Sequence, residues 1–109
     1  MTTAHPTRTY LERLAAAAAL GVPGVAYLRP GLADLLRGSP AQRQGGSGGV
    51  RARATDDPPA WRIEVHLAVV RGHRALDVTR AVRAAVEAAT TRAATGRPAV
   101  VSVTVTGVV

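Results

Sequence analysis

The clearest alternation of apolar and polar positions in the chain runs from residue 61 to residue 69. Apolar side chains occupy every second position, with Arg62, Glu64 and His66 between them. A period of two is typical of a strand that is buried on one face and exposed on the other. The buried face of this strand is expected to carry Trp61, Ile63, Val65, Leu67 and Val69.

A second alternating segment lies just before it, where Arg51 and Arg53 are interleaved with small apolar residues between positions 50 and 54. The connecting residues 56–59 read Asp-Asp-Pro-Pro, which favours a turn because proline cannot donate to a strand ladder. Two strands joined by a short polar turn predict an antiparallel hairpin.

After residue 73 the apolar period changes to about 3.6, which predicts a helix from about Ala75 to Thr95. Its apolar face is expected to consist of Val78, Val82, Ala85, Val86 and Ala89. Gly96 and Pro98 then favour a helix end, and residues 100–108 alternate as a half-buried strand. A helix between two strands is a crossover, so the last two strands are predicted to run parallel within a mixed sheet.

The first half of the chain has weaker patterns. We expect a flexible tail over residues 1–8 and a helix from Thr9 to Leu20, where Thr9 and Glu12 have the spacing of a capping box. Residues 25–28 are predicted to form a short edge strand, and residues 32–37 one or two helical turns. The glycine-rich residues 38–49 have almost nothing to bury, so they predict a flexible loop.

Together these elements predict an α+β fold with one small mixed sheet, two main helices packed on one face and the other face exposed. The whole of residues 9–109 is expected to form a single domain, since 109 residues fit one domain.

Charge and composition narrow the function. Arginine supplies all 14 basic side chains against seven acids, which gives a net charge of +7, and cysteine is absent. A basic protein favours an anionic partner such as nucleic acid, a membrane surface or an acidic protein. A solvated basic surface that keeps the protein soluble is an equally open interpretation. The absence of cysteine excludes disulfides, thiolate metal sites and a cysteine nucleophile.

The residues that usually carry out catalysis are scattered along the chain. His5, His66 and His73 lack the spacing of metal ligands, and no serine has a neighbouring histidine and aspartate pattern. Residues 45–49 are rich in glycine but lack the lysine and the following helix of a phosphate-binding loop. We therefore predict no catalytic residues, no metal, no cofactor and no enzymatic activity.

The exposed sheet face is the best candidate for binding. Arg51, Arg53, Arg62 and His66 are expected to lie on it as contacts for an anionic partner, beside hydroxyl groups of the last strand, those of Ser102, Thr104 and Thr106. Nucleic-acid binding through this basic face is an alternative function. Against it, the chain has only three aromatic residues, Tyr10, Tyr27 and Trp61, and single-strand platforms use exposed aromatics.

Four segments resemble the alkaline-shock protein family, also called the envelope-stress-response family. They are LAAAAALGVPGVAYL at 14–28, RIEVHLAVVRG at 62–72, DVTRAVRAAVEAAT at 77–90 and TGRPAVVSVTVTGV at 95–108. Their order and spacing match the family, although Arg71-Gly72 stands where the family commonly has Tyr-Gly, and residues 38–49 are unusually rich in glycine.

The resemblance implies a bacterial, cytoplasmic, non-enzymatic scaffold linked to cell-envelope stress. It also implies self-association and attachment near the membrane through a membrane-anchored protein partner, without a membrane span in this chain. The family supplies no catalytic residues.

Overall fold

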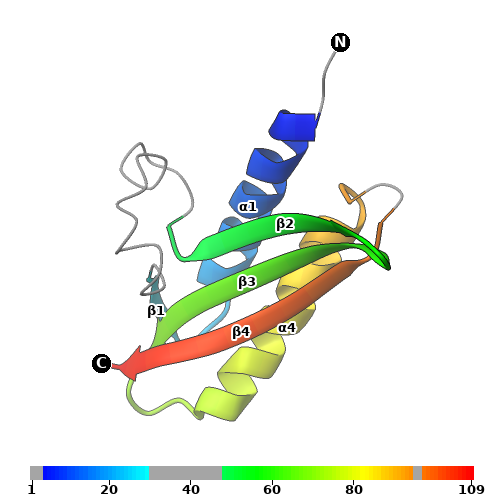
Figure 1. Cartoon of the computed structure of the whole chain (residues 1–109). Helices are drawn as coiled ribbons and strands as arrows, with labels where there is room; N and C mark the ends of the chain where they lie inside the picture. Colours follow the sequence, from blue (N-terminus) through cyan, green and yellow to red (C-terminus); the bar gives the residue numbers. More distant parts are fainter. Residues whose placement is uncertain (1–3, 30–47, 95–96) are drawn as a thin grey trace.

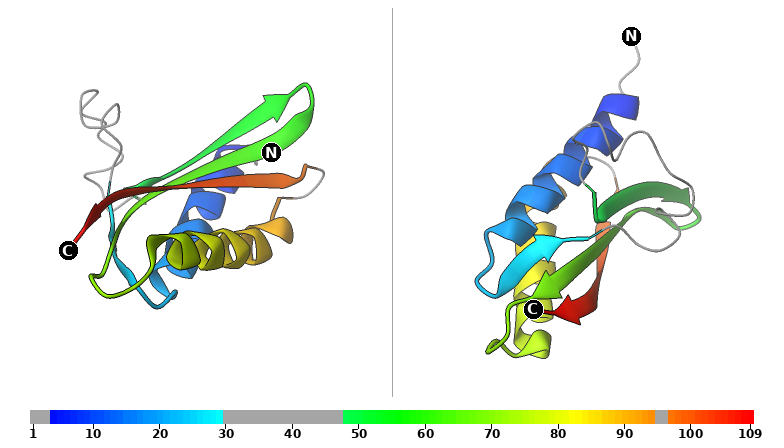
Figure 2. Two further views of the ribbon diagram at one scale, coloured as in Figure 1. Left: turned by 90° about the horizontal axis from the view of Figure 1, so that it is seen from below. Right: turned by 90° about the vertical axis from the view of Figure 1, so that its left-hand side faces the viewer.

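A computed structural model describes residues 4–29, 48–94 and 97–109. It has two helices packed on one face of a four-stranded sheet, as Figures 1 and 2 show, so the predicted α+β architecture is confirmed. The elements in chain order are α1 (Ala4–Leu20), β1 (Val25–Leu28), β2 (Val50–Asp56), β3 (Pro59–Val69), α4 (Ala75–Thr91) and β4 (Ala99–Val108).

The strand β3 lies at the centre of the sheet. Along one edge it pairs in parallel with β4, with Trp61 opposite Ala99 and Val69 opposite Val108. Along its other edge it pairs antiparallel with β2 over its first half and with β1 over its last residues. The predicted hairpin and the predicted parallel pair are both confirmed.

β1 and β2 meet on the edge of β3 at His66. The backbone N–H of His66 donates to the carbonyl of Gly49, at 2.7 Å, and its carbonyl accepts from the N–H of Arg29, at 2.8 Å. Gly49 has a φ of +91°, and a Cβ there would lie 2.7 Å from the nitrogen of Arg29. Only glycine fits this junction. The predicted turns at 32–37, and most of the predicted flexible loop 38–49, fall outside the described residues.

The core lies between the sheet and the two helices. The inward residues of β3 are buried as predicted, and they pack against α1 residues Leu11, Ala15 and Ala19. On β4, Val101 is buried, whereas Val103 and Val105 are only half-buried because β4 is an edge strand.

The helix α1 begins at Ala4, so the predicted tail boundary and the helix start at Thr9 are wrong. Pro6 does not oppose the earlier start, because the first turn of a helix does not use its N–H groups. The predicted capping box is also absent. The carboxylate of Glu12 instead accepts from the backbone N–H of Ala52 on β2, at 2.9 Å. That donor lies on the outer edge of β2, where β3 cannot reach it.

The helix α4 ends at Thr91, four residues before the predicted end at Thr95, which itself lies outside the described residues. Its fully buried positions are Val78, Val82, Val86 and Thr90, while Ala85 and Ala89 are half-buried. The pattern missed Thr90 because threonine counts as polar. Its hydroxyl donates to the carbonyl of Val86, at 2.7 Å, so it is buried without an unsatisfied group.

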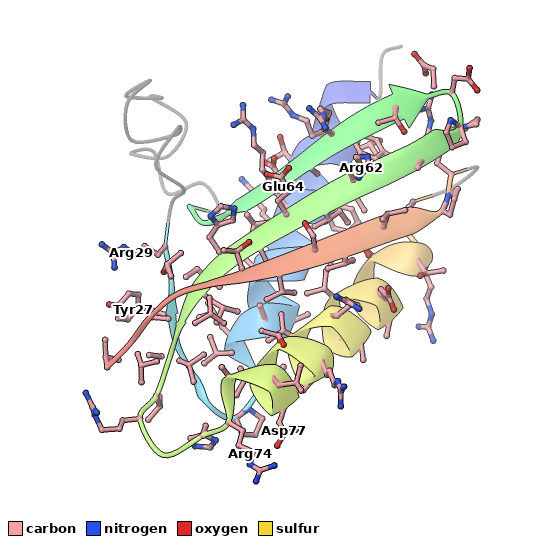
Figure 3. All side chains as sticks on the ribbon, turned by 60° about the horizontal axis from the view of Figure 1, so that its bottom comes forward. Tyr27, Arg29, Arg62, Glu64, Arg74 and Asp77 are labelled. Carbon is pink, nitrogen blue, oxygen red and sulfur yellow. The ribbon has the colours of Figure 1, made fainter. Side chains whose placement is uncertain are left out.

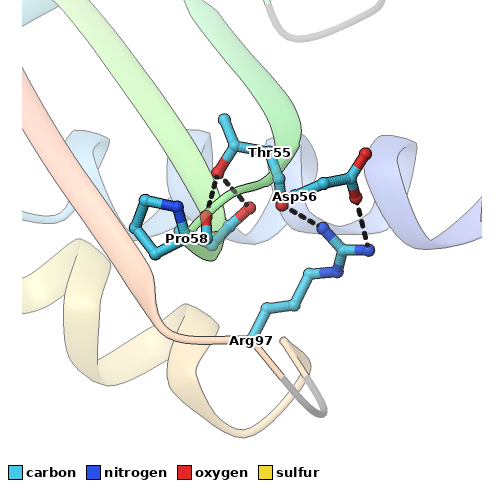
Figure 4. A network of polar contacts seen from close by, with 5 residues as sticks. Thr55, Asp56, Pro58 and Arg97 are labelled. Carbon is cyan, nitrogen blue, oxygen red and sulfur yellow. Dashed lines mark hydrogen bonds and ion pairs between the residues drawn. The ribbon is translucent and has the colours of Figure 1, made fainter.

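The crossover from α4 to β4 is tied to the tip of the β2–β3 hairpin through Arg97 (Figure 4). Its guanidinium donates to the carbonyl of Thr55 and to the carboxylate of Asp56, the latter at 3.2 Å. The Asp56 side chain is largely exposed, so the ion pair itself adds little stability. Its role is to hold the hairpin tip against the start of β4.

The buried position of Leu67 gives the first prediction. Leu67→Ala is expected to lower the free energy of unfolding by about 2–5 kcal/mol, because it leaves a cavity in a packed core. Chemical denaturation followed by circular dichroism measures the change. Thr104→Ala on the exposed face of the neighbouring strand is the control and should change stability by less than about 0.5 kcal/mol. Equal losses in the two variants would show that the face assignment is wrong.

The contact between Glu12 and β2 gives a second prediction. Glu12→Ala leaves the N–H of Ala52 without its acceptor and is expected to cost about 1–3 kcal/mol of stability. Glu12→Gln keeps an acceptor oxygen and should recover most of that loss in the same denaturation experiment. Glu87→Ala, whose carboxylate makes no hydrogen bond to the described residues, is the matched control. If Glu12→Gln and Glu12→Ala lower the free energy of unfolding equally, Glu12 does not stabilise the fold through this hydrogen bond.

Candidate functional site

The pairing of β2 with β3 decides which side chains lie together on the face of the sheet away from the helices. Arg51 and Arg53 on β2 lie directly opposite Glu64 and Arg62 on β3, and paired residues share a face. The side chains of all four are exposed. The structure therefore brings together three of the four predicted contact residues, and it adds Glu64 to them.

The pairing of Arg53 with Arg62 is electrostatically unfavourable, because like charges directly opposite each other destabilise a sheet. Neither guanidinium forms a hydrogen bond or an ion pair with the part of the chain that the structure describes. Arg51, Arg53, Arg62 and Glu64 together line a hollow of about 200 Å³ that is open to solvent. Arg53 and Arg62, two cationic side chains without a described partner, thus border a concave surface.

His66, the fourth predicted contact, lies on the same face but is half-buried and does not line the hollow. Its neighbour on β4 is Thr104. His73 lies in the turn before α4, where its ring packs over Gly24. Within the described residues, no three His, Cys, Asp or Glu side chains lie close enough together to hold a metal ion.

Sequence reasoning missed two residues of this face, Tyr27 and Arg29. Tyr27 pairs with Ala68, and the N–H of Arg29 bonds to His66, so both side chains lie on the face away from the helices. Figure 3 shows both at one end of the sheet, Tyr27 on β1 and Arg29 just after it. The guanidinium of Arg29 reaches to within 4.0 Å of a Cβ placed on Gly107 of β4. The alternating positions of Tyr27 and Arg29 in the sequence could have placed both side chains on one face of a strand. Which face of the sheet this is depends on how β1 pairs with β3, and the sequence pattern does not show that pairing.

We call Arg29, Arg51, Arg53, Arg62, Glu64, His66 and Tyr27 the basic face. Its four arginines and one glutamate give it +3 of the net charge of +7 that the whole sequence carries. The exposed hydroxyl-bearing residues Ser102, Thr104 and Thr106 of β4 adjoin it, as predicted.

A second surface is the outer edge of β4. The N–H of Trp61 donates to the carbonyl of Pro98, and in a parallel ladder the residues that face the partner strand alternate with those that face away. Val101, Val103 and Val105 therefore direct their backbone N–H and C=O groups away from β3. No described residue bonds to these groups, and we call them the open edge. In Figure 1 no described strand lies beyond β4 on this side.

No family model, curated protein or solved structure matches the chain. The resemblance to the alkaline-shock proteins therefore stays a prediction. None of the helices in the described part of the chain combines the length and apolar composition needed to cross a membrane.

Proposed function

We propose that this protein is a non-enzymatic scaffold that assembles by pairing the open edge of β4 with a strand of a second copy. The observation that carries the proposal is an unpaired edge on a strand as long as Ala99–Val108. Free N–H and C=O groups along an edge are a template for another strand.

The composition of β4 supports this use of its edge. Proteins that keep an edge strand monomeric usually place lysine, proline or inward-pointing charges on it. The strand β4 has none of these between Ala99 and Val108. The register of β4 on β3 shifts between Val105 and Gly107, so the regular part of the edge runs from Ala99 to Val105. This part carries none of the protecting residues, which favours a strand partner over solvent.

A second copy is a suitable partner because β4 complements itself. When two β4 strands pair antiparallel about a two-fold axis near Ser102 or Val103, the outward-facing backbone groups meet one another. With the axis at Val103, Ser102 lies opposite Thr104; with the axis at Ser102, Ser102 lies opposite itself. Hydroxyl pairs of this kind stabilise a sheet. The half-buried Val103 and Val105 become covered on the helix side. A two-fold contact of this kind closes on itself and gives a dimer.

The resemblance to the envelope-stress family supports the rest of the proposal. In that setting the scaffold is cytoplasmic and lies at the inner side of the envelope. A membrane-anchored protein holds it there, and its role in cell-envelope stress depends on protein contacts rather than on catalysis.

Placing charges on the strand tests self-association. Ser102→Lys with Thr104→Lys sets lysines against lysines in the paired strands, and both positions are exposed in the monomer. Wild-type protein is expected to show a concentration-dependent dimer in sedimentation equilibrium, since one strand pair makes a small interface. The double variant should remain monomeric at the same concentrations.

The matched control is Thr9→Lys with Ala17→Lys, which adds the same charge to exposed positions of α1. This control should dimerise like the wild type. A monomeric wild type, or a β4 variant that dimerises as well as the control, would overturn the proposal.

A further inference from the structure

We infer that the basic face binds single-stranded nucleic acid, with the phosphate backbone over the hollow at Arg53 and Arg62 and a base on Tyr27. This site is separate from the open edge of β4, so it adds a second activity to the proposed scaffold and does not depend on it.

The charge arrangement is the first argument. Arg53 and Arg62 face each other across neighbouring strands without a described acid partner, at a cost in repulsion. An anion placed between the two guanidinium groups attracts both of them and so offsets their mutual repulsion. Phosphate oxygens also fit the planar donor fork of arginine, which can bind them with two parallel hydrogen bonds.

The extent of the basic face favours a polymer over a small anion. Its arginines extend from Arg53, near the hairpin tip of β2, to Arg29 after β1 at the other end of the sheet. The hollow between Arg51, Arg53, Arg62 and Glu64 is open, so a chain can pass across it. Hydroxyl groups of Ser102 and Thr104 border the same face and can donate to further phosphate or sugar oxygens.

The shape of the face favours a single strand over a duplex. Both α1 and α4 lie on the opposite face of the sheet (Figure 2), so neither can enter a groove from this side. Single-strand sites combine a cationic groove with an aromatic platform. Tyr27 is 43% exposed on the same face as Arg29, which supplies the platform that the sequence pattern did not place.

The shape also argues against a lipid surface as the main ligand. Three of the four arginines of the basic face line a concave hollow, whereas a membrane is flat at this scale. A flexible strand can follow a hollow, and a planar array of headgroups cannot.

The test uses the whole chain and a labelled oligouridine of roughly a dozen nucleotides, a length within the usual range of single-strand sites. Fluorescence anisotropy measures the affinity at several salt concentrations. Arg53→Gln with Arg62→Gln is expected to weaken binding at least tenfold at low salt. The slope of log K against log salt should become shallower by about 1.4, because each lost phosphate contact contributes about 0.7 for single strands.

Two further variants separate charge from stacking. Arg80→Gln with Arg83→Gln removes the same charge from exposed positions of α4 and should leave the slope unchanged. Tyr27→Ala should weaken binding by about tenfold, as expected for one lost base stack, without changing the slope. Circular dichroism confirms that each variant is folded.

Several outcomes decide the inference. Equal affinity for oligouridine and oligothymidine supports recognition through the backbone, and a preference for RNA supports added contacts to the 2′-hydroxyl. An equal loss in the α4 control, salt-independent binding, or no binding overturns the inference. So does binding only to vesicles that contain phosphatidylglycerol. Binding that depends on Arg53 and Arg62 in a wild-type protein that sediments as a monomer would overturn the scaffold contact alone, so failure of self-association is distinguishable from failure here.

Discussion

The rest of the fold depends on the hydrogen bonding of β3 along both of its edges. A strand with five apolar residues on one face needs that face covered and both backbone edges paired. β4 satisfies one edge in parallel, and β1 and β2 share the other. At their junction, the end of β1 and the start of β2 both bond to the backbone of His66. Gly49 therefore lies so close to the backbone of Arg29 that it has no room for a side chain.

The parallel pairing of β3 with β4 decides which surfaces remain free. It requires a crossover through α4, and α4 packs beside α1 on one face of the sheet. The opposite face is left to the arginines, and the outer edge of β4 is left without a strand. A symmetric pairing of two β4 strands would join two basic faces in one continuous sheet. The proposed scaffold contact and the inferred nucleic-acid site are therefore compatible in one assembly.

Polar contacts between residues far apart in the sequence join the elements of this domain, and local sequence signals do not predict them. Glu12 accepts from β2 across 40 residues, and Arg97 joins the hairpin tip across 42. Thr90 is buried within α4 because it bonds to its own helix backbone. Each contact satisfies a group that the packing of other elements would otherwise leave exposed or unpaired.

By itself, the sequence determined the elements and faces that follow from periodicity. The strands over 50–54, 61–69 and 100–108, the hairpin and the parallel pair were predicted, as was the shared face of Arg51, Arg53, Arg62 and His66. Alternation and helical spacing are local, because a side chain's face depends on backbone geometry alone. Only the tertiary structure decided the partner of Glu12, the open edge of β4, and the place of Tyr27 and Arg29. These depend on which strand lies beside which and in what register, and no local pattern carries that information.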